Sequence, residues 1–152
     1  MKIRWDVLVL FGGGLALAKV IGSSGLAAWI ANAATVLENL PWFVIIVMIA
    51  AIIVFLGELA SNTAMAAIFL PISTAAAYGL GIDPVLLAAA VGLSASLGFM
   101  LPVATPPNAI IYGSSAVTIK EMLRAGFLLD VIGIVTVALL AVTIGVWVFT
   151  GV

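Results

Sequence analysis

The chain has 152 residues, of which 66% are hydrophobic and 7% are charged, with a mean hydropathy of +1.44 and a formal net charge of −1. Five Lys/Arg and six Asp/Glu residues cannot build the polar surface of a soluble domain of this length, so the sequence predicts an all-α, polytopic membrane protein. The absence of His and Cys excludes thiol chemistry and the usual zinc, haem and iron–sulfur sites, and the net charge provides no basic patch for nucleic acid.

The first two apolar stretches are expected to form a transmembrane helix and an interfacial helix. Block 7–20 is short for a span, so Trp5 and a snorkelling Lys19 would extend it to the two interfaces. The glycines at 12–14 favour close helix packing over phosphate binding, because neither a strand nor a Gly-Lys-Ser/Thr sequence follows them. The Ala-rich stretch 25–37 is predicted to lie in the interface as an amphipathic helix.

The third apolar block, residues 42–78, has its polar residues in the middle. Each apolar arm has about 15 residues and would form a helix of about 23 Å, shorter than the hydrocarbon core. A re-entrant helical hairpin accommodates both arms and places the polar tip, residues 58–63, at membrane depth. The alternative is one long tilted helix in which Ser61, Asn62 and Thr63 would bond a neighbouring helix.

The fourth block, residues 84–112, is predicted to be a broken transmembrane helix. Pro102, Pro106 and Pro107 each remove a backbone donor and clash with the preceding turn, so a continuous helix cannot pass through them. Thr105 is the expected N-cap of the second half, and Pro106 is its expected first residue.

The fifth block, residues 125–148, is long enough for a plain C-terminal span. Lys120 and Arg124 precede it and are interpreted as interfacial anchors. Asp130 near its start is interpreted as a partner of the helix dipole and not as a proton relay.

The distribution of basic residues chooses between the hairpin and the long helix. With a hairpin, four basic residues share one side of the membrane and one lies opposite, whereas a single crossing would leave almost no bias. The four basic residues on one side would be Lys2, Arg4, Lys120 and Arg124, and the basic residue on the opposite side would be Lys19. The hairpin is therefore favoured, with the N-terminus in the cytoplasm and the C-terminus outside a cell membrane.

Each break would expose backbone groups of both polarities. A helix ending at 57–60 leaves carbonyl oxygens that suit Na⁺, and one starting near Asn62 and Thr63 leaves N–H groups that suit an anion. Either Ser61 or Asn62 is the expected N-cap. The carbonyl of Ala104 ends the first half of the broken helix in the same way. Two such breaks in neighbouring segments indicate a midplane site of a secondary transporter.

Glu58 is an ionisable residue within an apolar block, which makes it a candidate functional residue by default. Capping of the hairpin by bonds to backbone amides is an equally good interpretation of this side chain.

The runs ELASNTA at 58–64 and LPVATPPNA at 101–109 resemble the paired SNT and TPPN signatures of the divalent-anion/sodium symporter family, the di- and tricarboxylate transporters. Residues 5–14 also resemble the family segment that precedes the hairpin. The resemblance implies an elevator-type carrier of two inverted repeats, of which this chain matches the C-terminal one. It implies Na⁺ as the coupling ion, no organic cofactor, no catalytic residue, and succinate, malate or fumarate in preference to sulfate.

The resemblance also implies the ligands of the site, position by position. The residues that would contact the substrate are Asn62, Thr63, Thr105, Pro106 and Pro107. The residues that would hold Na⁺ are Ala60, Ser61, Asn62 and Ala104, through the Asn62 side chain and the backbone carbonyls of Ala60 and Ala104. Gly57 stands where some relatives have Thr, so that hydroxyl ligand is absent.

The chain is expected to divide into a scaffold part, residues 1–41, and a transport-type half domain, residues 42–152. Each signature occurs once, whereas the family's site needs two copies. The expected partners are therefore a complementary N-terminal half, a second full transporter in a dimer, lipid and a small carboxylate. The alternative function is an accessory or assembly subunit without transport. An intramembrane enzyme is disfavoured because the sequence supplies no nucleophile–base pair.

Overall fold

The computed structural model describes residues 5–149, with side chains described at residue 9 and from 12 to 143. The topological roles predicted for Lys2 and Arg4, and the interfacial side chain of Trp5, therefore lie outside the described part. Within residues 5–149 every regular element is a helix. In chain order these are α1 (Trp5–Ser23), α2 (Leu26–Ala34), η1 (Thr35–Leu37), α3 (Trp42–Gly57), α4 (Asn62–Leu80), α5 (Pro84–Ala95), α6 (Pro106–Gly113) and α7 (Ile119–Phe149).

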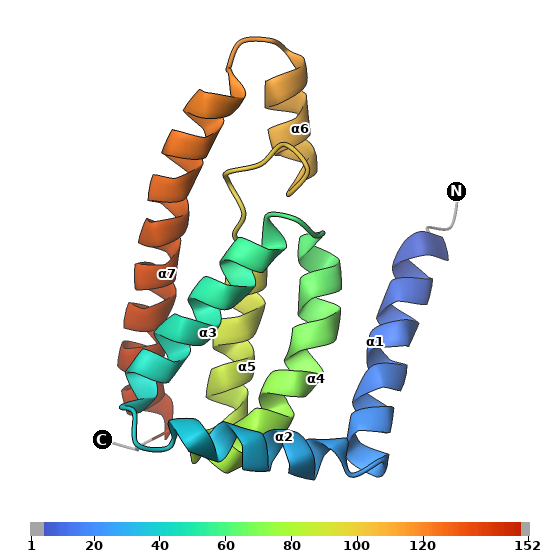
Figure 1. Cartoon of the computed structure of the whole chain (residues 1–152), viewed down its shortest axis with the longest axis vertical. Coiled ribbons are helices and arrows are strands. Elements are labelled where there is room, and N and C mark those ends of the chain that lie inside the picture. Colours follow the sequence, from blue (N-terminus) through green and yellow to red (C-terminus); the bar gives the residue numbers. More distant parts are fainter. Residues whose placement is uncertain (1–4, 150–152) are drawn as a thin grey trace.

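Helices α3 and α4 form a hairpin. In Figure 1, α3 rises to mid-height, turns, and α4 returns to the end from which α3 began. The proposed alternative, one helix through this block, is wrong. The length argument holds only for α3, however, because α4 continues to Leu80 and its 19 residues are long enough to cross a membrane alone.

Helices α5 and α6 are separated by a non-helical segment, residues 96–105, which we call the unwound segment. Figure 1 shows α6 continuing above α5, beyond the tip of the hairpin. The prediction of a broken helix is confirmed, but the break is displaced: α5 already ends at Ala95, before the first of the three prolines, and Pro106 and Pro107 are the first two residues of α6.

Helix α7 begins at Ile119, six residues before the predicted start of the span. The reason is a capping box: Thr118 N donates to Oε2 of Glu121 at 2.8 Å, and Glu121 N donates to Oγ1 of Thr118 at 3.4 Å. This start places Asp130 in the fourth turn of the helix, where it is fully buried. The interpretation of Asp130 as a dipole partner at the helix start is therefore wrong.

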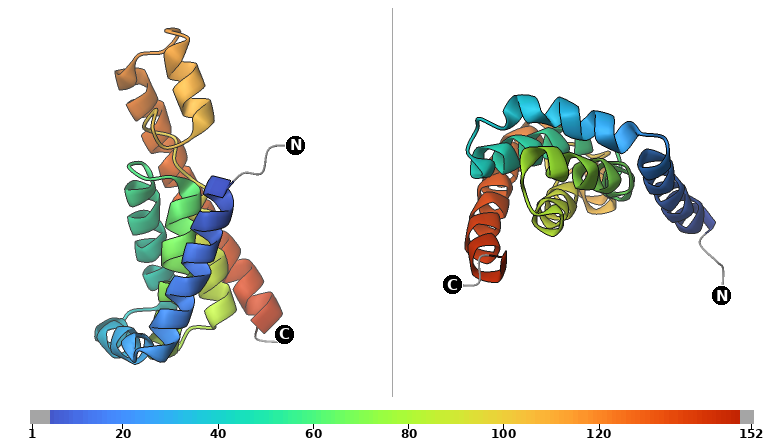
Figure 2. Two further views of the ribbon diagram at one scale, coloured as in Figure 1. Left: turned by 90° about the vertical axis from the view of Figure 1, so that its right-hand side faces the viewer. Right: turned by 90° about the horizontal axis from the view of Figure 1, so that it is seen from below.

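Helix α2 is turned by 79° from the preceding helix and runs across the lower end of the molecule. Seen from below in Figure 2, α2 follows one edge from α1 towards α3, and α1 stands beside the bundle of α3, α4 and α5. The placement of α2 in the membrane interface stays a prediction.

The main core lies between α3, α5 and α7, with contributions from α4. It is built from fully buried aliphatic side chains such as Ile46, Val54 and Leu87. A smaller cluster, Ile53, Met65, Val91 and Ala95, packs the upper part of the hairpin against α5. The hairpin tip is thus held by packing next to the upper end of α5.

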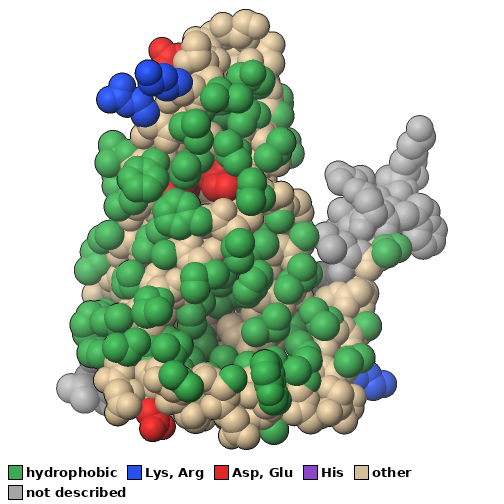
Figure 3. Space-filling model, in the orientation of Figure 1, with side chains coloured by type: hydrophobic (Ala, Val, Ile, Leu, Met, Phe, Trp, Pro, Cys, Tyr) green, Lys and Arg blue, Asp and Glu red, His purple; other side chains and the backbone are tan. Residues whose placement is uncertain are grey.

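Hydrophobic side chains are spread over the face of the molecule that Figure 3 shows, and on α7 large side chains such as Leu128, Ile132 and Leu139 are half or more exposed. Such a surface is stable only against lipid or further protein. Two helices, or three with the bent α1–α2 pair, are long and apolar enough to cross a membrane. The chain has the fold of a polytopic membrane protein.

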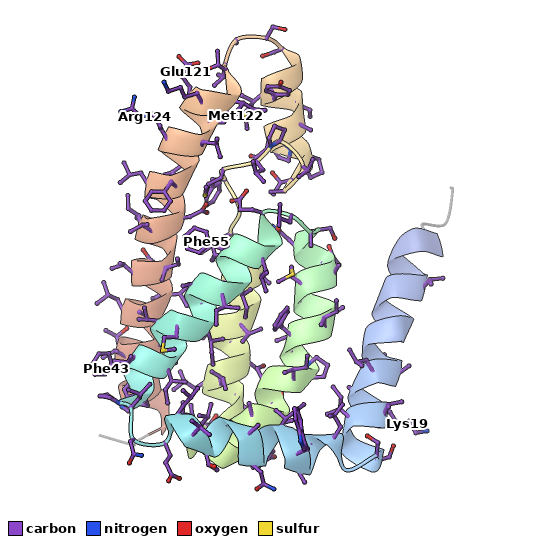
Figure 4. The ribbon with its side chains drawn as sticks, viewed as in Figure 1. Lys19, Phe43, Phe55, Glu121, Met122 and Arg124 are labelled. Atoms are coloured by element: carbon purple, nitrogen blue, oxygen red, sulfur yellow. The ribbon has the colours of Figure 1, made fainter. Side chains whose placement is uncertain are left out.

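Apart from Glu58 and Asp130, which are buried between them, the described charged side chains lie near the two ends of the molecule. In Figure 4, Lys19 lies at the lower end, and Glu121 and Arg124 lie at the upper end. The hairpin topology requires Lys19 and Arg124 to lie on opposite sides of the membrane, and in the structure they lie at opposite ends of the molecule.

Candidate functional site

The hairpin turn ends one helix and starts the next within four residues. Ser61 has extended backbone and its hydroxyl accepts from Ala64 N at 3.2 Å, so Ser61, and not Asn62, is the N-cap of α4. On the other side of the turn, Ala60 N donates to the Gly57 carbonyl at 3.2 Å. The Ala60 carbonyl therefore lies between the last turn of α3 and the cap of α4.

Asn62 is the first residue of α4 and carries the least satisfied polar atom of the turn. Its side-chain oxygen, Oδ1, is buried and has no hydrogen-bond partner among the described residues. A buried amide oxygen without a partner costs about 1–3 kcal/mol, so this position favours a donor or a cation beside it.

The second break is capped as predicted. Thr105 has extended backbone, its hydroxyl accepts from Asn108 N at 3.4 Å, and Pro106 is the first residue of α6. Ala104 is buried, and its N–H donates to the Leu101 carbonyl at 3.2 Å. Ala104 therefore lies in a short turn before the cap, and the expectation that its carbonyl ends the first half of the broken helix is wrong, because α5 ends at Ala95.

The two breaks meet at Gly98. A Cβ atom placed on Gly98 would lie 3.4 Å from Cβ of Ala104 and 3.7 Å from Oδ1 of Asn62. It would lie 3.8 Å from Oε1 of Glu58. Gly98 has φ of 150°, a backbone conformation that favours glycine. The structure thus brings together the side chain of Asn62 and the residue Ala104, for both of which the family resemblance implies a role in a Na⁺ site.

Glu58 is buried and bonds to the unwound segment. Its Oε1 accepts from Met100 N at 2.9 Å, and its Oε2 accepts from Leu101 N at 2.7 Å. The prediction that Glu58 bonds backbone amides is therefore confirmed, but the prediction that it caps the hairpin is wrong, because both amides belong to the second break.

Three further residues complete the junction, and the sequence interpretation missed their roles. Asn108 is buried and its Nδ2 donates to the carbonyls of Gly98 and Leu101, both at 3.0 Å. Asp130 lies beside Glu58 and the Phe99 backbone, and neither of its oxygens has a hydrogen-bond partner in the described part of the chain.

Gly126 is the third. A Cβ atom there would collide with the carbonyl of Phe99 and would lie 2.5 Å from Cα of Met100, so α7 and the unwound segment touch backbone to backbone. The TPPN motif could have pointed to Asn108, and the capping box at Thr118 could have placed Asp130 inside the helix. No sequence signal distinguishes Gly126 from the other glycines.

The remaining predicted ligands lie at the edge of the junction. Thr63, Pro106 and Pro107 are exposed, and Thr105 is half-buried. The junction therefore has a closed side, formed by Glu58 and Asn108, and an open side that presents the starts of α4 and α6.

This arrangement offers two kinds of ligand. Backbone carbonyls and an amide oxygen are hard oxygen donors that suit Na⁺. The free N–H groups at a helix start, together with hydroxyl groups, suit a carboxylate. The donor set fits a small cation and an anion side by side.

An apolar groove of about 390 Å³ lies elsewhere, between α1, α2 and α4. Half of its lining residues are alanine, and Thr74 and Tyr78 are its polar members. Because it is remote from both breaks, we do not include it in the candidate site.

Comparison with known proteins gives consistent matches. The family model described as the sodium:sulfate symporter transmembrane region matches residues 1–150. The chain is 42% identical to the sodium-dependent dicarboxylate transporter SdcS of Staphylococcus saprophyticus, over 90% of this chain and 26% of that protein. It is 40% identical to solute carrier family 13 member 2 of Mus musculus, over 91% of this chain and 24% of that protein.

An uncharacterized transporter of Haemophilus influenzae is 44% identical over 88% of this chain and 29% of that protein. The chain thus spans about a quarter of the length of the curated relatives that it matches.

Proposed function

Because this chain belongs to the sodium:sulfate symporter family, we propose that it forms part of a membrane transporter that couples Na⁺ to the movement of di- or tricarboxylates, with succinate, malate and fumarate as first candidates. The names of two relatives, a sodium-dependent dicarboxylate transporter and a solute carrier, support transport over catalysis. The protein would then work by exposing its binding site to one side of the membrane and then to the other, and not by a covalent reaction.

The observation that carries the proposal is the unpartnered Oδ1 of Asn62 at the junction of two broken helices. In the proposed site this oxygen and the backbone carbonyls of Ala60 and Ala104 coordinate one Na⁺. Ser61 contributes by capping α4, which stabilises the start of the helix that carries Asn62. The ion would supply the partner that Asn62 lacks, and would place a positive charge next to the substrate.

The substrate carboxylate would lie on the open side of the junction. Asn62 and Thr63 contact it from the start of α4, and Thr105, Pro106 and Pro107 form the facing wall. The exposure of Thr63 and of both prolines leaves these groups available to a ligand. A carboxylate next to Na⁺ neutralises it, so each ligand increases the affinity for the other by direct attraction.

Residues 42–152 would be the transport-type half domain of a C-terminal inverted repeat, and residues 1–41 would belong to a scaffold. Helices α3, α5 and α7 share one hydrophobic core, which supports the proposal that residues 42–152 move as one rigid unit. A complementary N-terminal half would supply the second SNT and TPPN pair, and two full transporters would form the dimer. Elevator movement of the half domain against the scaffold would then change access.

The N-terminus would lie in the cytoplasm and the C-terminus outside the cell membrane. The positions of Lys19 and Arg124 at opposite ends support a topology in which α1 crosses and the hairpin does not.

Uptake of labelled succinate into liposomes tests the function. The sample is the assembled transporter that contains this chain, with and without a Na⁺ gradient. We expect Na⁺-dependent uptake that Asn62→Ala abolishes and Asn32→Ala, at an exposed site on α2, leaves intact. If the assembled protein takes up no dicarboxylate in Na⁺, yet forms a stable complex with another membrane protein that Asn62→Ala does not disturb, the accessory role replaces this proposal.

A further inference from the structure

We propose that Glu58 is a positioning residue that attaches the unwound segment to the hairpin and thereby sets the separation of the two carbonyl groups that hold Na⁺. This inference rests on the proposed function, and it concerns a residue that does not itself touch the ion or the substrate.

The attachment is a pair of hydrogen bonds over a long sequence separation. Glu58 stands at the end of α3, and both of its carboxylate oxygens accept from consecutive amides, Met100 N at 2.9 Å and Leu101 N at 2.7 Å. Those two N–H groups lie in the unwound segment, where no preceding helical carbonyl is available to them. The carboxylate therefore replaces the hydrogen bonds that the break removed.

Leu101 carries this attachment towards the predicted ion ligand. Its N–H donates to Glu58, and its carbonyl accepts from Ala104 N at 3.2 Å. The same carbonyl accepts from Nδ2 of Asn108 at 3.0 Å. A displacement of Leu101 must therefore move Ala104 as well.

The other end of the attachment lies two residues before the Ala60 carbonyl. Glu58 N donates to the Val54 carbonyl at 3.2 Å, so the backbone of Glu58 continues the last turn of α3. A rigid helix end and one short side chain thus connect the two predicted carbonyl ligands, Ala60 and Ala104. Without that connection, Gly98 and Leu101 would keep the side-chain hydrogen bonds from Asn108, and Phe99 and Met100 would keep only their packing against Gly126.

The identity of the side chain matters because both bonds need an acceptor. A carboxylate has two acceptor oxygens, whereas a glutamine side chain has one acceptor and one donor. In Glu58→Gln the donor would face a backbone N–H, and one of the two bonds would be lost without a change in side-chain volume.

The test measures the Na⁺ dependence of succinate uptake by the assembled transporter in liposomes. We expect Glu58→Gln to raise the Na⁺ concentration for half-maximal uptake about tenfold, equivalent to about 1.4 kcal/mol, while saturating Na⁺ restores the maximal rate. Glu58→Asp keeps both acceptors on a shorter side chain and should lie between the wild type and Glu58→Gln.

Glu121→Gln is the matched control. It removes a carboxylate that also accepts from a backbone amide, at Thr118, but at an exposed position on the start of α7. Its Na⁺ dependence should equal that of the wild type.

A structural role alone would lower the amount of folded transporter or the maximal rate and leave the Na⁺ half-saturation unchanged. That result for Glu58→Gln overturns the inference. Absence of Na⁺-dependent uptake in the wild type instead overturns the proposed function, so the two failures are distinguishable.

If Glu58→Gln does not assemble, hydrogen exchange of the wild type decides. Na⁺ should slow exchange in peptides that cover residues 98–104, because the ion would hold the segment that Glu58 positions. An unchanged exchange rate in this segment on addition of Na⁺ would reject the inference.

Discussion

Replacement of Gly126 by alanine tests the contact between α7 and the unwound segment. The added Cβ would collide with the Phe99 carbonyl and approach Cα of Met100 to 2.5 Å, whereas ordinary contacts between carbon atoms are about 3.5–4.0 Å. Either α7 or the unwound segment must therefore move by about 1 Å. Overpacking of this kind costs about 1–3 kcal/mol, and the better helix propensity of alanine returns about 0.5–1 kcal/mol. We expect a net destabilisation of about 1–2 kcal/mol.

The displacement has a second consequence, because the Glu58 carboxylate accepts hydrogen bonds from the backbone amides of Met100 and Leu101. Gly126→Ala should therefore also weaken the stabilisation of the purified transporter by Na⁺. The assay is the apparent melting temperature in detergent, measured with and without Na⁺.

Gly92→Ala is the control for helix propensity. Gly92 lies inside α5, and a Cβ atom there would meet no atom within 4 Å. This variant should be as stable as the wild type or more stable by about 0.4–1 kcal/mol. Equal melting temperatures for Gly126→Ala and Gly92→Ala, with equal shifts on addition of Na⁺, would refute the reasoning.

Three other substitutions probe the fold around the site. Gly79→Ala should loosen the contact between α2 and α4, because the added Cβ would collide with the backbone of α2. Limited proteolysis of the loop between α2 and α3 would detect the change. Gly113→Ala is the control, because a Cβ atom there meets nothing within 4 Å. Ser61→Ala should cost about 1 kcal/mol in unfolding free energy and Ser61→Gly only a few tenths, since the hydroxyl caps α4. Leu87→Ala, at a fully buried position, should cost about 2–5 kcal/mol in a denaturation titration, and Val85→Ala, at an exposed one, far less.

Each of these expectations has a contrary outcome. Equal cleavage of the Gly79 and Gly113 variants would mean that α2 does not pack on α4 as described. A Ser61→Gly variant as unstable as Ser61→Ala would assign the loss to something other than the cap. Equal costs at Leu87 and Val85 would contradict the position of the core.

The two helix breaks could be predicted because their causes are local. Three prolines within six residues prevent a continuous helix from passing through them wherever the chain lies, and a serine or threonine before a helix start is a cap in any fold. Ser61 and Thr105 therefore have in the structure the capping role that the sequence suggests. The same local logic would have placed the start of α7 correctly if the capping box at Thr118 had been recognised.

The contacts between the breaks could not be predicted in this way. Glu58 and Leu101 are 43 residues apart, and no periodicity or motif relates them. Residue type identifies Glu58 as a buried carboxylate that needs partners, but many backbone amides could have served. Only the packing of α3 on α5 selects Met100 and Leu101.

The sequence alone determined the solvent, the helices and the positions where they break, since composition, hydropathy and proline chemistry act over a few neighbouring residues. The tertiary structure decided which broken ends meet, that Asn62 faces Ala104 across Gly98, and that Gly126 must remain small. These depend on how whole helices pack, because a hydrogen bond or a steric contact exists only when two distant backbones are brought within a few ångströms of each other.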